Sequence, residues 1–142
     1  MSTPHQTFRK GIFDYFNADQ SSGTVYDAVS GRLYGVSAPE DPTFPYLSLM
    51  SVSMVEWDTF NLTGQAGRYQ FTAISDNAHD ESEILDIMDK LRTRFDHASL
   101  TLSGSGLTTF TIVDFDPAGD SGPEIIEDRM AATQDYILTA HQ

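Results

Sequence analysis

An acidic run late in the chain contains the residue types of a calcium-binding loop. It spans Asp114–Asp120 and has the letters DFDPAGD. An EF-hand loop takes oxygen ligands from its first, third and fifth positions and ends with a glutamate at its twelfth. Counted from Asp114, the fifth position is Ala118 and the twelfth is Ile125, so two ligands are missing. We interpret the run as a solvated acidic loop, with an irregular cation site as the alternative.

The other candidate groups do not have catalytic or metal-binding spacing either. The four histidines show neither the spacing of a helical metal pair nor an HExxH motif, and they are His5, His79, His97 and His141. A second group of acids falls on the polar side of a predicted helix, and it comprises Asp76, Asp80, Glu81, Glu83, Asp86 and Asp89. The short serine–glycine segments lack the GxSxG and P-loop patterns. We therefore predict no catalytic residue, no metal and no cofactor, and hence no enzyme.

Composition narrows the class of protein further. The chain has 142 residues, no cysteine, and 8 Lys+Arg against 21 Asp+Glu, which gives a formal charge of −13. This length predicts one domain over residues 1–142, and the lack of cysteine excludes disulfides and thiolate-bound metal. No apolar run approaches the roughly 20 residues of a membrane span. The acidic balance argues against a domain that binds nucleic acid through clustered Lys and Arg.

Apolar periodicity predicts the helices that would position these groups. Thr7–Phe16 carries apolar residues at helical spacing, and a short helix or turn is predicted over Val25–Val29. The strongest helix runs from about Ala78 to Phe95. Its apolar stripe consists of Ile84, Met88, Leu91 and Phe95, widened by Leu85 and Ile87.

The remaining segments predict strands and two long loops. Extended segments are expected at Arg32–Tyr34, Tyr46–Trp57, Arg68–Ser75, Ser99–Ser103, Thr108–Phe115 and Thr133–Ala140. Asp58–Gly67 is predicted as a hairpin loop, and Asp114–Arg129 as an acidic loop. This order predicts an α+β fold. We expect a mainly antiparallel sheet of about four to five strands, with a long helix and an N-terminal helix packed on one face.

Several short motifs follow one another in a recognisable order. They are Gly31-Arg32-Leu33-Tyr34, Phe44-Pro45-Tyr46-Leu47, Trp57-Asp58-Thr59, Leu100-Thr101-Leu102 after the long helix, and Asp116-Pro117-Ala118-Gly119 before the closing strand. Together with the helices, they resemble the small tail-completion proteins of long-tailed bacteriophages and gene-transfer particles, over roughly Phe8–Ala140. That family includes tail terminators and tail-to-head joining proteins. Ala118–Ala132 departs from the family pattern because it is long and unusually acidic.

The resemblance implies a structural virion protein of the tail or neck, assembled in the host cytoplasm. Similar proteins form homo-oligomeric rings, typically hexamers, that cap the head-proximal end of the tail tube and end tube polymerisation. The implied partners are the tail-tube protein and a head–tail connector or stopper protein, with no membrane. The resemblance implies no catalytic residues.

A closed ring of identical subunits needs two different lateral surfaces on each subunit, plus an axial one. Loops often carry such contacts, so we expect interface or lumen residues in the two predicted loops. The candidates are Trp57, Asp58, Phe60 and Asn61 in the first loop, and Asp114, Asp116, Asp120, Glu124, Glu127, Asp128 and Arg129 in the second.

The implied ring suggests a role for the negative charge of the chain. Six copies, each with a formal charge of −13, give −78 per ring. An acidic lumen wall would repel phosphate and let DNA pass without specific binding. General solubility explains the same charge equally well.

Two other classes of function remain open. One is a different neck or tail component, either a connector adaptor or a tail-tube subunit; a tube subunit would form long polymers by itself. The other is an acidic binding module or enzyme that depends on a cation. That class predicts a concave pocket with convergent carboxylates.

Overall fold

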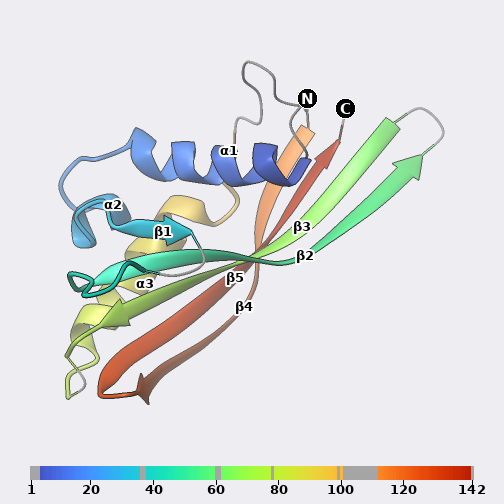
Figure 1. Cartoon of the computed structure of the whole chain (residues 1–142). Coiled ribbons are helices and arrows are strands. Elements are labelled where there is room, and N and C mark those ends of the chain that lie inside the picture. The colour runs from blue at the N-terminus through green and yellow to red at the C-terminus, as the bar shows by residue number, and fades with distance from the viewer. Residues whose placement is uncertain are drawn as a thin grey trace.

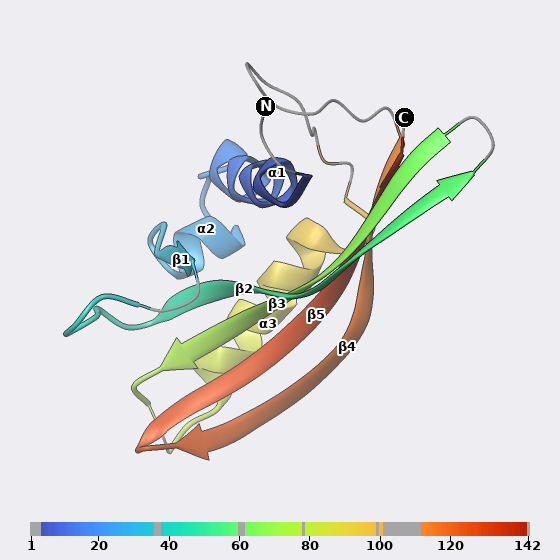
Figure 2. The same cartoon turned by 45° about the vertical axis from the view of Figure 1, so that its right-hand side comes forward.

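The computed structural model describes residues 4–35, 38–59, 62–77, 79–98, 100 and 112–141. These residues form a single sheet with helices. The element order is α1 (Pro4–Ala18), α2 (Val25–Ala28), β1 (Leu33–Gly35), β2 (Tyr46–Thr59), β3 (Leu62–Ser75), α3 (Ser82–Phe95), β4 (Ile112–Ile126) and β5 (Arg129–His141). The helices lie to one side of the twisted sheet (Figures 1 and 2). The predicted α+β class is therefore confirmed.

The five strands are arranged in the order β1-β2-β3-β5-β4. β2, β3, β5 and β4 pair antiparallel with their neighbours, whereas the short β1 pairs parallel with β2 and places Leu33 opposite Leu47. The sheet is therefore mixed. Of the predicted strand at Ser99–Ser103 only Leu100 is among the described residues. The second half of the strand predicted at Thr108–Phe115 forms the start of β4, and its first half lies outside the described residues.

The hairpin loop predicted over Asp58–Gly67 is wrong for most of its length. β2 continues to Thr59 and β3 begins at Leu62. Glycine weakens a strand interior, but Gly64 and Gly67 are paired on both sides, with β2 and with β5. The ladder on each side holds these residues in the sheet despite their low strand propensity.

The acidic loop predicted over Asp114–Arg129 is also wrong. Residues 112–126 form β4, and Glu127 and Asp128 alone make the turn to β5, with φ of 48° and 62°. β4 lies at the edge of the sheet and, among the described strands, pairs with β5 alone. A proline in it therefore takes no hydrogen bond away from a second neighbouring strand. Register shifts at Pro117/Gly119 and Ser121/Glu124 accommodate the turn-forming residues that suggested a loop.

The core lies between the helices and one face of the sheet. α3 begins at Ser82 rather than Ala78, and its predicted stripe is buried, apart from Leu85, which is exposed. The stripe packs with alternate residues of β3 and β5, including Tyr69, Phe71 and Tyr136. The Tyr136 ring stacks on Phe115 at 4.7 Å, so the edge strand β4 is anchored to the same core.

Candidate functional site

The first set of predicted interface residues lies near the end of β2, whereas the second set is spread along β4 from that same end of the sheet to the β4–β5 turn. Trp57 and Asp58 are near the end of β2, opposite Gly64 and Thr63 of β3, while Phe60 and Asn61 lie outside the described residues. The second set follows β4 into the turn after Ile126, at the end where β2 begins (Figure 1). Asp114 and Asp116 therefore lie toward the end of the sheet that carries Trp57, with β3 and β5 in between, whereas Glu124, Glu127 and Asp128 lie at the other end.

The acids of the second set are all exposed along the edge strand and its turn. They are Asp114, Asp116, Asp120 and Glu124 on β4, and Glu127 and Asp128 in the turn. Two of them have partners within the chain. Asp120 Oδ2 accepts a hydrogen bond from Arg92 Nη2 at 2.8 Å, and Asp116 Oδ1 lies 2.9 Å from His97 Nδ1. Among the described residues, no group of three or more His, Asp or Glu side chains is placed to hold a metal ion.

Arg92 connects the long helix to the edge of the sheet. Besides its ion pair with Asp120, it donates from Nε to Gln134 Oε1 of β5 at 3.0 Å. Gln134 in turn donates from Nε2 to the carbonyl of Gly119 at 3.0 Å. The chain of contacts fixes the bulged part of β4 against α3. From the sequence alone, Arg92 can be recognised only as a cation near the end of the helix, because its partners Asp120 and Gln134 are far away in the chain.

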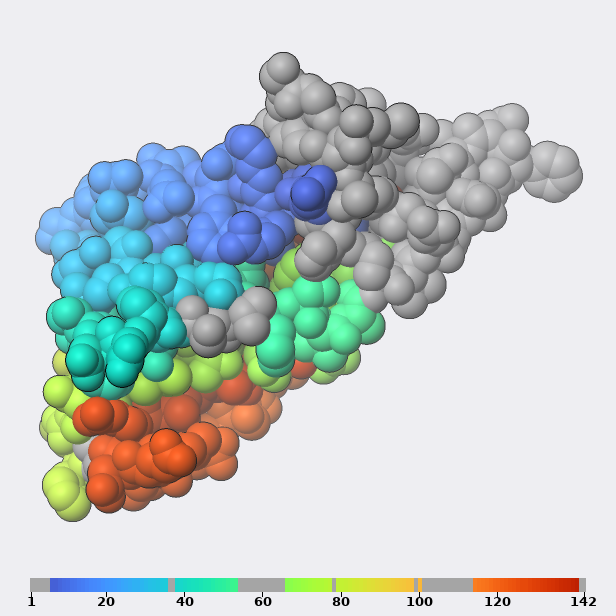
Figure 3. Space-filling model, in the orientation of Figure 1, coloured from blue at the N-terminus to red at the C-terminus, as the bar shows by residue number. Residues whose placement is uncertain are grey.

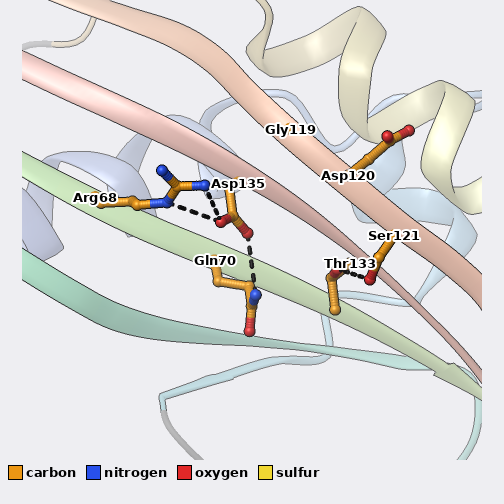
Figure 4. A pocket seen from close by; sticks show the side chains of 7 residues that line it. All are labelled: Arg68, Gln70, Gly119, Asp120, Ser121, Thr133 and Asp135. Atoms are coloured by element: carbon orange, nitrogen blue, oxygen red, sulfur yellow. Dashed lines mark hydrogen bonds and ion pairs between the residues drawn. The ribbon is translucent and has the colours of Figure 1, made fainter.

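A polar depression of about 210 Å³ lies beside this bulge, on the sheet face that carries Arg68 and Gln70 (Figure 4). Arg68 binds the Asp135 carboxylate, with Nη2 2.8 Å and Nε 2.9 Å from Oδ2, and Gln70 Nε2 donates to Oδ1 at 3.0 Å. Arg68 Nη2 also lies 3.4 Å from the Ala118 carbonyl. These side chains form hydrogen bonds and an ion pair with one another. We therefore interpret the depression as part of the structure of the bulge, without a group that is free to react.

A second hollow, of about 270 Å³, lies beside the β4–β5 turn. Its lining comprises Phe44, Tyr46, Thr72, Ile74, Ile126, Glu127, Arg129 and Ala131. The Arg129 guanidinium sits 4.3 Å from the centre of the Phe44 ring, and Phe44 contacts Tyr46 at 5.4 Å. Burial raises the pKa of Tyr46 above its usual value, and the nearby Arg129 partly opposes that rise. The sequence prediction included Arg129 but missed the aromatic wall that holds it.

The described acidic residues of the second set thus lie along the edge strand β4 and its turn to β5. None of the helices in the described part is long and apolar enough to cross a membrane. No curated protein matches the chain. A chain in the solved structure "Virion of native gene transfer agent (GTA) particle" matches it with a TM-score of 0.80 and 12% identity, over 100% of both chains, which shows a shared fold. The model of the family "Tail completion protein gp17" matches residues 13–124. The chain therefore belongs to the tail completion protein gp17 family.

Proposed function

We propose that this protein is a structural component of a virion tail. It caps the head-proximal end of the tail tube, ends tube polymerisation and joins the tail to the head connector. The observation that carries this proposal is the family match over residues 13–124. The fold shared over its whole length with a chain of a gene transfer agent virion supports it. The protein acts through contact surfaces and is not an enzyme.

The capping form is a homo-oligomeric ring, and we propose a hexamer. Identical subunits close a ring when each uses two different surfaces that meet on its neighbours. The long sheet supports this arrangement because it separates the β2–β3 end from the β4–β5 turn (Figure 1). One subunit can then contact two neighbours with different parts of its surface.

The acidic side chains of β4 have a second proposed use in such a ring. If this strand borders the lumen, its carboxylates repel DNA phosphate and keep the channel from binding the genome. The exposure of Asp114, Asp116, Asp120 and Glu124 supports the idea. An assembled ring with all four on its outer surface would contradict it.

Electron microscopy of tail tubes that lack their terminator tests the proposed function. Purified protein is mixed with such tubes, and the tube ends are imaged with and without it. We expect a ring on one end of each tube, and no long polymers of the protein alone. Bare tube ends at saturating protein would refute the capping function. Polymers of the protein alone would instead indicate a tube subunit.

A further inference from the structure

The last part of β2 is a strand edge that has a neighbour on one side only. β1 pairs with β2 opposite residues 47–49, whereas β2 continues to Thr59. Residues 53–59, which we call the β2 edge, pair with β3 in unbroken register, and no other described strand adjoins them. They include neither proline nor lysine, the residue types that commonly block an edge. The β2 edge therefore presents backbone N–H and C=O groups to which a further strand can bind.

The approach to the β2 edge is open to solvent. Met50 and Val52, which precede it, are 42% and 50% exposed. This blue-green part of β2 lies at the surface of the face shown in Figure 3, and in Figures 1 and 2 the strand projects from there beyond the helices. The described helices thus leave this part of the strand free for a partner.

The opposite edge of the sheet is blocked over most of its length. β4 contains Pro117 and Pro123, and its register with β5 shifts at Pro117/Gly119 and Ser121/Glu124. Prolines and bulges are devices that keep an edge strand from pairing with another chain. Residues 112–116, by contrast, pair with β5 in unbroken register and include neither proline nor glycine. We call them the β4 start, and they form the part of this edge that can accept a strand.

The two open stretches lie level with each other on opposite edges of the sheet. Val55 stands opposite Ala66 of β3, Ala66 opposite Thr139 of β5, and Thr139 opposite Asp114 of β4. These residues form one row across the sheet and share one of its faces. Since every step along the row is antiparallel, β2 and β4 run in opposite directions.

We propose that the β2 edge of one subunit pairs antiparallel with the β4 start of a second copy of the chain. The inference rests on the proposed ring and names the lateral surfaces that close it. A rotation about an axis along the strands keeps every strand direction, so β4 of one subunit meets an oppositely directed β2 of the next. Two different edges meet in each contact, and such heterologous contacts generate a ring when the rotation closes.

The level register of the two edges also keeps like charges apart. In the rows that both stretches share, each acid stands opposite an uncharged residue of the other subunit: Asp114 opposite Val55, Asp116 opposite Ser53, and Glu56 opposite Val113. Like charges directly opposite one another destabilise a strand pair. This register avoids that penalty although both stretches are acidic.

A second copy accounts for both open stretches at once. Each subunit supplies the two halves of the contact, matched in level and in direction. A strand of an unrelated protein would use the β2 edge alone and leave the regular start of β4 unexplained. Two β2 edges could pair with each other, but that isologous contact ends at a dimer and leaves both β4 starts unpaired.

Engineered disulfides test the pairing, because the chain has no cysteine of its own. Val55→Cys with Asp114→Cys joins two subunits in the level register, since opposite residues of antiparallel strands have Cα atoms within the range that a disulfide spans. Within one subunit β3 and β5 lie between these positions, so the bond can form only between subunits. Ile112→Cys or Asp116→Cys in place of Asp114→Cys covers a shift of two residues in either direction.

Ser48→Cys with Ser121→Cys is the matched control. These serines also stand in one row, with Thr72 and Thr133 between them, but β1 pairs with β2 at Ser48 and register shifts lie on both sides of Ser121. All variants are assembled on tail tubes that lack their terminator, oxidised, and run on denaturing gels without reductant. We expect covalent multimers up to the hexamer from a β2–β4 pair, and monomers from the control.

The gels distinguish failure of this inference from failure of the proposed function. Rings that form on the tubes without a cross-link from any β2–β4 pair would overturn the inference, and so would equal cross-linking of the control. A covalent dimer from Val55→Cys alone would also overturn it, because two β2 edges would then lie together. Absence of rings with the unaltered protein would instead refute the proposed function.

Hydrogen exchange of the unaltered protein tests the same contact if a cysteine variant folds poorly. Exchange is compared between free subunits and rings on the tubes. We expect the backbone amides of the β2 edge and the β4 start to exchange more slowly in the rings, because the new ladder protects them. Amides around Ser48 and Ser121 should keep their rates. Unchanged exchange of either open stretch, in rings seen by electron microscopy, would overturn the inference.

Discussion

Arg68 of β3 binds the carboxylate of Asp135 on β5 through both its Nη2 and Nε atoms, at 2.8 and 2.9 Å. The same guanidinium lies 3.4 Å from the Ala118 carbonyl in the bulge of β4. One side chain therefore connects the three strands that end in the acidic edge (Figure 4). The shape of that edge depends on a polar contact across the sheet as well as on the core beneath it.

Arg68→Met is expected to lower the free energy of unfolding by about 1–2 kcal/mol, because the Asp135 side chain is only 14% exposed and would lose its charged partner. Urea denaturation measures the change. Removing both partners in Arg68→Met with Asp135→Asn should cost less than the sum of the single changes. Strict additivity would show that the pair contributes nothing to stability.

Tyr136→Phe is expected to destabilise the fold by about 1 kcal/mol, the net value of one hydrogen bond. The Tyr136 hydroxyl donates to Asp96 Oδ1 at 2.6 Å, and this links β5 to the end of α3. The ring itself stays in place because phenylalanine preserves its stacking on Phe115. Thermal and urea unfolding measure the loss, and Asp96→Ala, which removes the acceptor, serves as the matched change on the other partner. Unchanged stability in both variants would show that the contact is not formed in solution.

Stability is expected to fall as the pH rises above 10. Burial raises the pKa of Tyr69 and of Tyr136 above the ordinary value of 10.0, and the hydrogen bond to Asp96 adds to the rise at Tyr136. Above pH 10 the folded state keeps these phenolic protons while the unfolded state loses them, so unfolding is favoured by about 1.4 kcal/mol per pH unit for each tyrosine. Urea denaturation between pH 8 and 11 tests this. In Tyr69→Phe the slope should be shallower, and an identical slope would contradict the assignment.

Gly122→Ala is expected to destabilise the protein more than Gly119→Ala. Both glycines have positive φ, at 94° and 133°, so each substitution strains the backbone by about 1 kcal/mol. An added Cβ at Gly122 would also lie 2.8 Å from the Ala131 carbonyl oxygen, whereas one at Gly119 would meet nothing within 4 Å. The further cost at Gly122 is about 1–3 kcal/mol. Equal melting temperatures for the two variants would show that the hairpin moves to relieve the clash.

The sequence predicts those parts of the fold whose signal is periodic and local. The stripe of α3 follows from spacing alone, and burial confirms it apart from Leu85. β4 could not be predicted in the same way. Its Pro117, Gly119 and Gly122 are turn formers, and only its place at the edge of the sheet lets them remain in a strand.

Prediction of the candidate site was limited by sequence separation. Charge and residue type identified the acidic residues of the edge, but not that Arg92 binds Asp120 or that Phe44 supports Arg129. These contacts join segments that are far apart in the sequence, so no local pattern encodes them. The parallel pairing of β1 with β2 is non-local for the same reason.

The central claim is that this protein ends polymerisation of the tail tube. The most direct measurement adds free tube protein to preformed tubes and follows their length by electron microscopy, with and without prior addition of this protein. We predict that treated tubes stop growing at the capped end while untreated tubes continue to elongate. Growth at the same rate in both samples, at saturating concentrations of this protein, would contradict the claim.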